Sequence, residues 1–317
     1  MRVLLWHVHG SWTTAFVQGK HEYLLPLDAE RSPDGRGRAR TWDWPASARE
    51  VPVEQLRDEP IEVVVLQRPH ELDLLRQWTG LDAGRTISAV YLEHDTPRGP
   101  AASTRHPVAD REDLVLVQVT AFNAVMWDAG STPTCVIEHG IPDPGPLWTG
   151  ERERVAAVIN EPVRRWRIAG TDVLLDVAGH VPTEIYGMGV GELEPFVPPG
   201  TPLRNLSQAE LHRDLAGARA YLHPYRWTSL GLALVEAMTI GMPVLALATT
   251  AVPESVPPEA GVISTDPATL RAAAKRLLAD PGEARERGAA ARRHALDRFS
   301  LDRFLARWND LLLEVTR

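Results

Sequence analysis

Residues 223–254 constrain the fold of this chain more than any other stretch. They have the sequence HPYRWTSLGLALVEAMTIGMPVLALATTAVPE, in which Thr228 and Ser229 precede an apolar run that ends at Gly241. The apolar side chains that recur at helical spacing within this run are Leu232, Leu234, Val235 and Met238. Threonine and serine are favoured N-cap residues, and glycine commonly ends a helix. The pattern therefore predicts a loop, a short helix, a tight turn, a buried strand and a second loop.

Glu236 lies inside the predicted helix, among apolar neighbours. A carboxylate in such surroundings costs free energy unless it binds something, so Glu236 is a candidate ligand-binding residue. The start of the helix is a second candidate site, because the amides of Ser229, Leu230 and Gly231 would be free to bind an anion. Gly231 would also let a ligand approach the backbone closely. The alternative is an ordinary helix that carries one solvated glutamate.

The same stretch matches a known family signature in residue type and in order. The matching residues are Gly231, Leu232, Glu236, Ala237, Met238, Gly241, Pro243, Val244, Pro253 and Glu254. This pattern resembles the C-terminal signature of the retaining GT-B glycosyltransferases of family 4, the glycosyl transferases group 1. Two positions depart from it: Thr228 replaces the first glutamate of the family's E-x7-E pair, and Thr250-Ala251 replace the usual Gly-Gly.

The resemblance implies an α/β protein of GT-B type, with two Rossmann-like, doubly wound domains that face a central cleft. It also implies transfer of a sugar from a nucleotide diphosphate to an acceptor, with no metal and no cofactor. In this front-face mechanism the departing diphosphate oxygen takes the proton of the acceptor hydroxyl. The family assigns the ribose hydroxyls to the residue matched by Glu236. The other substrate-binding positions implied in this stretch are Thr228, Ser229, Leu230, Gly231 and Leu232.

Length and composition narrow the remaining classes. The chain has 317 residues, enough for two domains of ordinary size, and a formal charge of -8, which argues against a nucleic-acid partner. Cys135 is the single cysteine and cannot form an internal disulfide, so a cytoplasmic location is expected. No apolar run approaches the length of a membrane span, and none has the pattern of a signal peptide.

The N-terminal residues predict the opening of the first domain. Residues 3–8 form an apolar run that predicts a buried strand, followed by His9 and Gly10 and by a loop at residues 11–13. A strand that ends in a glycine turn opens the ligand crevice of doubly wound domains, so Gly10 is a candidate substrate contact. His7 and His9 would share one face of the strand, as metal ligands or as hydrogen-bonded histidines at the strand end.

A later strand, predicted at residues 86–93, runs directly into His94. Pro97 and Gly99 force a loop at its carboxyl end, where open parallel sheets bind ligands. In the family that this chain resembles, a histidine at this strand end contacts the transferred sugar, which implies a catalytic role for His94. The alternative is a histidine that only caps the strand end.

The predicted strand at residues 134–138 is followed by a proline-rich connection. This connection resembles the family's N-G-V-D crossover, with His139 in place of the asparagine. We therefore expect an N-terminal acceptor-side domain over residues 1–148 and a nucleotide-sugar-binding domain over residues 149–300. The terminal helix at residues 301–317 is expected to cross back to the first domain.

A cluster of arginines follows the first predicted strand of the second domain. Arg164, Arg165 and Arg167 precede Gly170 and Thr171, and Thr171 is a suitable N-cap for the next helix. Guanidinium groups hold phosphate oxygens bidentately and keep their charge, so the cluster suits a diphosphate. The resembled family uses an arginine and a lysine here; this implies catalytic roles for Arg165 and Arg167 and substrate binding for Arg164. A solvated basic loop is the alternative.

Three functions remain open. The favoured one is a glycosyltransferase that acts on a nucleotide-sugar donor and a small-molecule or glycan acceptor. A related GT-B enzyme, such as a sugar-nucleotide epimerase or a phosphorylase, is a second possibility. The third is a non-catalytic nucleotide-sugar binding protein, for which Thr228 in place of glutamate is the argument. The chain has neither a G-x-x-x-x-G-K-[ST] nor a G-x-S-x-G motif, which removes P-loop ATPases and α/β-hydrolases.

Overall fold

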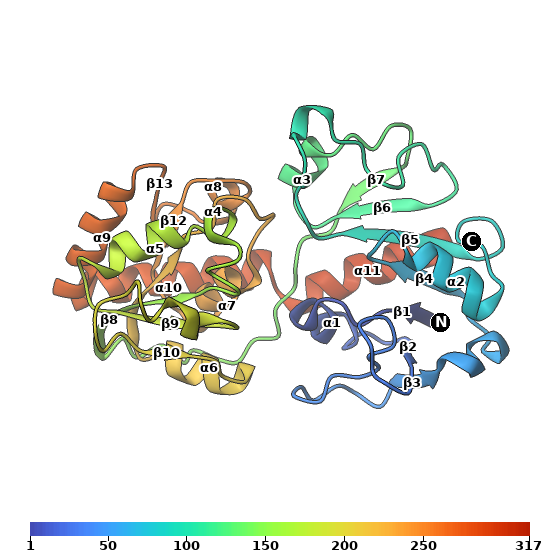
Figure 1. The fold of residues 1–317 in the computed structure, drawn as a ribbon, viewed down its shortest axis with the longest axis horizontal. Coiled ribbons are helices and arrows are strands. Elements are labelled where there is room, and N and C mark those ends of the chain that lie inside the picture. The colour runs from blue at the N-terminus through green and yellow to red at the C-terminus, as the bar shows by residue number, and fades with distance from the viewer. The chain divides into compact units, whose positions relative to one another are not determined.

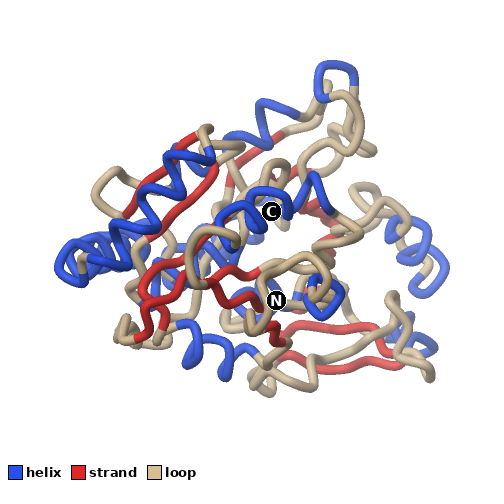
Figure 2. The backbone as a smooth tube through the Cα atoms, turned by 60° about the vertical axis from the view of Figure 1, so that its left-hand side comes forward, coloured by secondary structure: helices blue, strands red, loops and turns tan.

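The computed structural model describes residues 1–317, and the chain forms two compact units. Unit 1 consists of residues 1–140 together with the C-terminal residues 301–317, and unit 2 consists of residues 141–300. Each unit contains one parallel β-sheet, and strands and helices alternate along the chain, as Figures 1 and 2 show. None of the helices combines the length and the apolar character needed to cross a membrane.

Unit 1 contains a seven-stranded sheet in the order β3-β2-β1-β4-β5-β6-β7, and all neighbouring strands are parallel. Its strands are β1 (Arg2–Leu5), β2 (Glu22–Leu27), β3 (Ala48–Pro52), β4 (Val63–Leu66), β5 (Ser88–Glu93), β6 (Val115–Gln118) and β7 (Thr134–Val136). Its helices are α1 (Gly10–Phe16), α2 (Glu71–Thr79), α3 (Ala121–Met126) and α11 (Leu301–Val315), with 3-10 turns η1 (Val53–Asp58) and η2 (Ala101–Ser103). The strand order reverses between β1 and β4, so the carboxyl ends of these two strands flank the crevice of a doubly wound sheet.

Unit 2 contains a six-stranded parallel sheet in the order β10-β9-β8-β11-β12-β13. Its strands are β8 (Arg152–Val158), β9 (Thr183–Tyr186), β10 (Leu203–Arg204), β11 (Ala218–His223), β12 (Val244–Leu247) and β13 (Gly261–Ser264). Its helices are α4 (Trp166–Ala169), α5 (Thr171–Ala178), α6 (Gln208–Leu215), α7 (Leu232–Ile240), α8 (Val252–Ser255), α9 (Pro267–Ala279) and α10 (Pro281–Arg298), with the 3-10 turn η3 (Val190–Leu193). Here the order reverses between β8 and β11.

The core of unit 1 includes a cluster of aromatic rings between α1 and the C-terminal helix α11. Trp12 and Phe16 of α1 lie with ring centroids 4.7 Å apart, and Trp308 of α11 lies 5.6 Å from Trp12 and 5.0 Å from Phe16. All three side chains are buried. Residues nearly 300 positions apart in the sequence therefore complete one core, and α11 is an integral part of unit 1.

Most of the expected elements are present, and the largest differences lie near the N-terminus. Residues 11–13, expected in a loop, belong to α1, and the first strand ends at Leu5 rather than at residue 8. Strand β2 was not expected. It pairs with β1 and β3 and is largely buried, and these long-range contacts stabilise the strand. The short helix α4 likewise occupies part of the expected arginine loop.

The first unit ends at Gly140 rather than at residue 148. The connection belongs to unit 2 because its polar groups are bonded there: Trp148 donates its backbone N–H to Ile240, and Asp143 pairs with Arg292. Proline in this segment limits the backbone donors, and those of Ile141 and Trp148 find carbonyl partners in unit 2, at Phe299 and Ile240.

We expect Trp308→Ala to destabilise unit 1 by roughly 3–5 kcal/mol, since the change leaves a large cavity among buried aromatic rings. Urea unfolding followed by circular dichroism measures the effect as a separate early transition of the unit. Leu313→Ala is the matched control on the same helix, because Leu313 is 41% exposed and its loss should cost about 0.5 kcal/mol. Equal effects of the two changes would contradict an integral role for α11.

Candidate functional site

Four polar side chains of unit 1 follow the carboxyl ends of its strands. Gln67 and His94 come directly after β4 and β5, while His9 and His139 lie a few residues beyond β1 and β7. Since all these strands are parallel, their carboxyl ends lie at one edge of the sheet. This edge is where open α/β sheets bind ligands.

His94 lies at the centre of this group. Its ring centroid is 4.0 Å from that of His9 and 6.3 Å from that of His139. Its Nε2 atom lies 3.0 Å from Oε1 of Gln67, and its ring meets the edge of Trp12. The sequence predicted His94 at the sheet edge, and the structure adds four neighbours that were not predicted to be close to it.

Burial determines the charge of these histidines. It lowers the pKa of His94 well below the ordinary value, with a further contribution from His9 and His139, and it lowers the pKa of His139 to about 3. The pKa of His9 is also lowered, chiefly by burial and against the attraction of Asp95. The rings are therefore neutral near pH 7, and they offer hydrogen bonds rather than positive charge.

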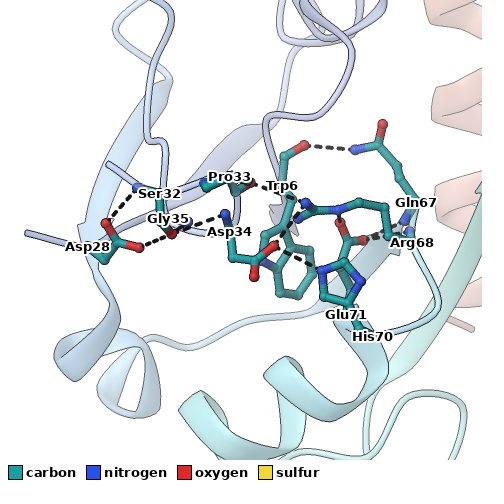
Figure 3. A network of polar contacts seen from close by, with 10 residues as sticks. All are labelled: Trp6, Asp28, Ser32, Pro33, Asp34, Gly35, Gln67, Arg68, His70 and Glu71. Carbon is teal, nitrogen blue, oxygen red and sulfur yellow. Dashed lines mark hydrogen bonds and ion pairs between the residues drawn. The ribbon is translucent and has the colours of Figure 1, made fainter. Parts of the chain in front are cut away.

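Gln67 is held by a network of charged and polar groups that Figure 3 shows. The buried carboxylate of Glu71 accepts from the backbone N–H of Gln67 at 2.6 Å and from Nε of Arg68 at 2.6 Å. Arg68 also pairs with Asp34 at 2.9 Å, which in turn contacts His70. These bonds fasten the loop before β3 to the start of α2, and they fix the backbone from which the Gln67 side chain extends.

Gly10 is the first residue of α1, next to His9. A Cβ atom at this position would lie 3.5 Å from the ring of Trp42, an ordinary contact distance. His7 does not share a strand face with His9, because β1 ends at Leu5; its Nδ1 lies 3.1 Å from the carbonyl oxygen of Gly37. No three His, Cys, Asp or Glu side chains in the chain are arranged to hold a metal ion.

The carboxyl edge of the unit 2 sheet carries a second group, at the point where the strand order reverses. Asn160 and Arg165 follow β8, and Tyr225 follows the neighbouring β11. The backbone N–H of Asn160 donates to the Tyr225 hydroxyl at 3.3 Å, and the guanidinium of Arg165 lies 5.8 Å from the centroid of the Tyr225 ring. This cation–π contact orients Arg165 without neutralising its charge.

The three predicted arginines differ in their partners. Arg164 pairs with Glu161, with Nε to Oε1 at 2.9 Å. Arg167 pairs with Asp172 at 2.9 Å, and the same carboxylate also binds Arg226. Arg165 makes no ion pair, so its guanidinium is the one of the three without an acidic partner.

Helix α7 begins at Leu232, and its N-cap is Gly231, with no side-chain cap. The expectation that Thr228 or Ser229 caps the helix is therefore wrong, and the free amides at the helix start are those of Leu232 and Ala233 rather than those of Ser229 and Leu230. A Cβ at Gly231 would lie 2.4 Å from Cε1 of the buried His223, so the position has room for glycine alone. Ser229 and Leu230 are buried in the loop, and Thr228 is partly exposed.

Glu236 lies on α7 and is 5% exposed. Its Oε1 accepts from Nε2 of Gln208 at 2.7 Å, and its Oε2 lies 3.3 Å from Nε2 of His212. Both partners belong to α6, which begins with a capping box between Ser207 and Glu210. The buried carboxylate thus has two donors from its own unit, and each oxygen keeps a second acceptor position for a ligand.

Similarly, Thr171 is the first residue of α5 rather than its cap, since Gly170 takes the N-cap position with φ 72°.

Thr250 has φ 50° in the loop after β12. This conformation is costly for a β-branched residue and natural for glycine. The resembled signature has Gly-Gly at this loop, where glycine would adopt such a φ without strain.

Part of unit 2 matches a known protein family. Residues 169–280, from the end of α4 to α9, match the family model of the glycosyl transferases group 1. No curated protein shows significant similarity to the sequence.

Solved structures resemble the chain over its whole length. HepE from Anabaena, in complex with UDP and glucose, has a TM-score of 0.75 at 13% identity, with 99% of this chain and 100% of HepE covered. Sucrose-phosphate synthase from Thermosynechococcus elongatus has a TM-score of 0.72 at 15% identity, covering 99% of each chain. TarM has a TM-score of 0.65 at 14% identity, covering 79% of this chain and 54% of TarM, so this chain spans about half of that protein.

At these identities the likeness shows the fold, which is the GT-B fold of two Rossmann-like domains. The family model that residues 169–280 match is one of glycosyl transferases.

Sequence reasoning missed several residues of the two groups, which are Gln67, Asn160, Gln208, His212 and Tyr225. Gln67 carried a usable signal, since it ends the apolar run of residues 61–67, which forms the strand beside the one that leads to His94. The contacts of α6 with Glu236 depend on how two helices pack and have no local signal.

The buried histidines predict how stability depends on pH. Because the folded-state pKa of His139 is about 3 and the unfolded value is near 6.5, its contribution is complete above about pH 6.5 and is lost as the pH falls toward 3. His139→Asn should reduce the slope of unfolding free energy against pH by up to about 1.4 kcal/mol per unit. Urea unfolding at pH 7 and pH 5 measures the slope. His180→Asn, at an exposed position, is the control and should leave the slope unchanged. If His139→Asn also leaves the slope unchanged, the pKa of His139 is not lowered by burial.

Proposed function

We propose that this protein is a retaining glycosyltransferase that transfers a sugar from a nucleotide diphosphate to an acceptor hydroxyl, by a metal-independent front-face mechanism. The observation that carries the proposal is the position of Arg165, a guanidinium without an acidic partner at the switch point of the unit 2 sheet. Arg165 lies over the ring of Tyr225, and that ring stacks on His223. His223 in turn lies against Gly231, the N-cap of α7. One side chain and one helix start thus offer positive potential at the same sheet edge.

The diphosphate of the donor is assigned to Arg165 and to the free amides of Leu232 and Ala233. Negative charge develops on the leaving diphosphate during transfer, and preorganised donors stabilise it most where that charge appears. Arg164 and Arg167 are held by Glu161 and Asp172, so their share is smaller. The diphosphate oxygen itself takes the proton of the acceptor, and the protein supplies orientation and electrostatic stabilisation.

Glu236 is assigned to the ribose hydroxyls of the nucleotide, through the acceptor positions that Gln208 and His212 leave open. In unit 1, His94 is assigned to a hydroxyl of the transferred sugar, and Gly10 lets the substrate approach the start of α1. Unit 1 is proposed to bind the acceptor and unit 2 the donor nucleotide. The reaction needs no cofactor in this scheme, and the lone Cys135 fits a reducing cytoplasm.

Uridine diphosphate sugars are the first donors to test, because HepE has been solved with UDP-glucose. Thermal unfolding with a panel of nucleoside diphosphates and their glucose, mannose and N-acetylglucosamine conjugates identifies the donor. A ligand at a hundred times its dissociation constant should raise the free energy of unfolding by about 2.7 kcal/mol. Absence of a shift with every nucleotide would refute the proposal.

The best donor is then incubated with and without EDTA, and the product anomer is assigned by NMR. The retaining, metal-independent mechanism predicts equal rates in both samples and a product with the configuration of the donor. Slow hydrolysis of the donor without acceptor distinguishes an enzyme from the alternative that Thr228 favours, a non-catalytic nucleotide-sugar binding protein.

We expect Arg165→Ala to lower the turnover of the best donor by roughly 10²-fold, since it removes a preorganised donor to the leaving charge. Arg164→Ala, on the same loop and of the same size, should reduce turnover much less, because its guanidinium is already paired with Glu161. Steady-state kinetics of both variants decide the point. An equal or larger loss of turnover for Arg164→Ala would contradict the assignment of the diphosphate to Arg165.

A further inference from the structure

The side chain of Gln67 has one possible orientation. Its Nε2 donates to the carbonyl oxygen of Trp6 at 2.7 Å, a bond visible in Figure 3. Rotating the amide by half a turn would face two acceptor oxygens toward each other, which costs free energy in a buried place. Oε1 of Gln67 must therefore be the atom that faces Nε2 of His94, at 3.0 Å.

This orientation determines the tautomer of His94. An amide oxygen accepts but does not donate, so Nε2 of His94 must carry the proton. A neutral imidazole has one N–H, and Nδ1 is then a free acceptor. His94 makes no other hydrogen bond to the protein, and its side chain is partly exposed. The ring thus presents an unprotonated nitrogen to a ligand that can donate, such as a hydroxyl group.

The support behind Gln67 is unusually rigid for a residue at the end of a strand. Its backbone N–H is bound by the carboxylate of Glu71, a side chain with 0% exposure. Arg68 holds the other oxygen of that carboxylate. The amide therefore sits between two fixed points, the Trp6 carbonyl and the start of α2, and its remaining oxygen is aimed at His94. His9 and His139 approach His94 ring to ring but form no hydrogen bond with it.

We propose that Gln67 is a positioning residue that locks His94 in the tautomer with the proton on Nε2, so that Nδ1 accepts a hydrogen bond from a hydroxyl of the transferred sugar. The identity of the ligand rests on the proposed glycosyltransferase function, whereas the lock on His94 does not. The Gln67 amide acts through the orientation of His94, in the way that hydrogen-bond partners of metal-binding histidines select a tautomer.

The test reads the tautomer directly. In protein labelled with 15N-histidine, long-range proton–nitrogen spectra distinguish a protonated from an unprotonated ring nitrogen, and loss of a signal in His94→Ala assigns the ring among the 11 histidines. The wild-type protein, without substrate, should show protonated Nε2 and bare Nδ1 for His94. A wild-type ring with the proton on Nδ1 would by itself overturn the proposal.

Variants then isolate the role of Gln67. Gln67→Met keeps the length of the side chain but removes the acceptor, so His94 should populate both tautomers, and turnover should fall roughly 10- to 100-fold with a smaller change in donor KM. Gln67→Glu keeps an acceptor for Nε2 but loses the donor to the Trp6 carbonyl, so the proton should stay on Nε2 while the side chain is held less firmly. Gln18→Met, at an exposed position of the same unit, should change neither the spectrum nor the rate.

The two proposals fail differently. If Gln67→Met keeps the wild-type tautomer while its turnover falls, the residue has a merely structural role and this inference is wrong, although the glycosyltransferase function stands. If no sugar is transferred by any form of the protein but the tautomer still depends on Gln67, the lock stands and the proposed function fails. Circular dichroism of each variant verifies the fold, and the wild-type spectrum still tests the proposal if the methionine variant does not fold.

Discussion

Parallel strand pairing is the constraint on which the rest of this structure depends. Every strand in both sheets is parallel to its neighbours, so the chain must return across the sheet between strands, and all carboxyl ends collect at one edge. Residues that follow different strands are thereby brought together without being close in sequence. His9, Gln67 and His94 meet in unit 1 in this way, and Asn160, Arg165 and Tyr225 meet in unit 2.

The two edges have opposite electrostatic character. In unit 1 burial removes charge, because the histidine pKa values fall and the rings act as neutral donors and acceptors. In unit 2 charge is kept, since Arg165 lies over an aromatic ring instead of beside a carboxylate. A sugar carries many hydroxyls and no charge, which suits the neutral edge of unit 1. A diphosphate is an anion, which suits the charged edge of unit 2.

Much of this could be predicted from the sequence, for identifiable reasons. Strands β4, β5 and β11 are short, largely buried runs, and helices α9 and α11 bury one apolar face, so their patterns are easy to recognise. His94 could be placed because it directly follows a strand. The start of α7 was misplaced because threonine and serine are stronger N-cap signals than the glycine that caps this helix. The ion pairs of Arg164 and Arg167 with Glu161 and Asp172 could not be predicted either, because they depend on side-chain geometry in the folded loop.

The departures from the family signature affect side chains more than backbone. Thr250 holds a left-handed conformation that glycine adopts without strain, so the loop is shaped by its surroundings and not by its own residue. Thr228 shortens a side chain at the edge of the proposed site while the loop around it keeps its buried neighbours, Ser229 and Leu230. Such positions alter what a site contacts and leave its framework in place.

The integration of α11 into unit 1 has a consequence for the order in which the protein is made. Residues 141–300 leave the ribosome before residues 301–317, so unit 2 has its whole sequence available while unit 1 still lacks its last helix. Until Trp308 emerges, the rings of Trp12 and Phe16 have no cover from α11. The half of the protein that is synthesised first is therefore the half that can complete its core last, and until then the aromatic side chains of α1 lack their cover.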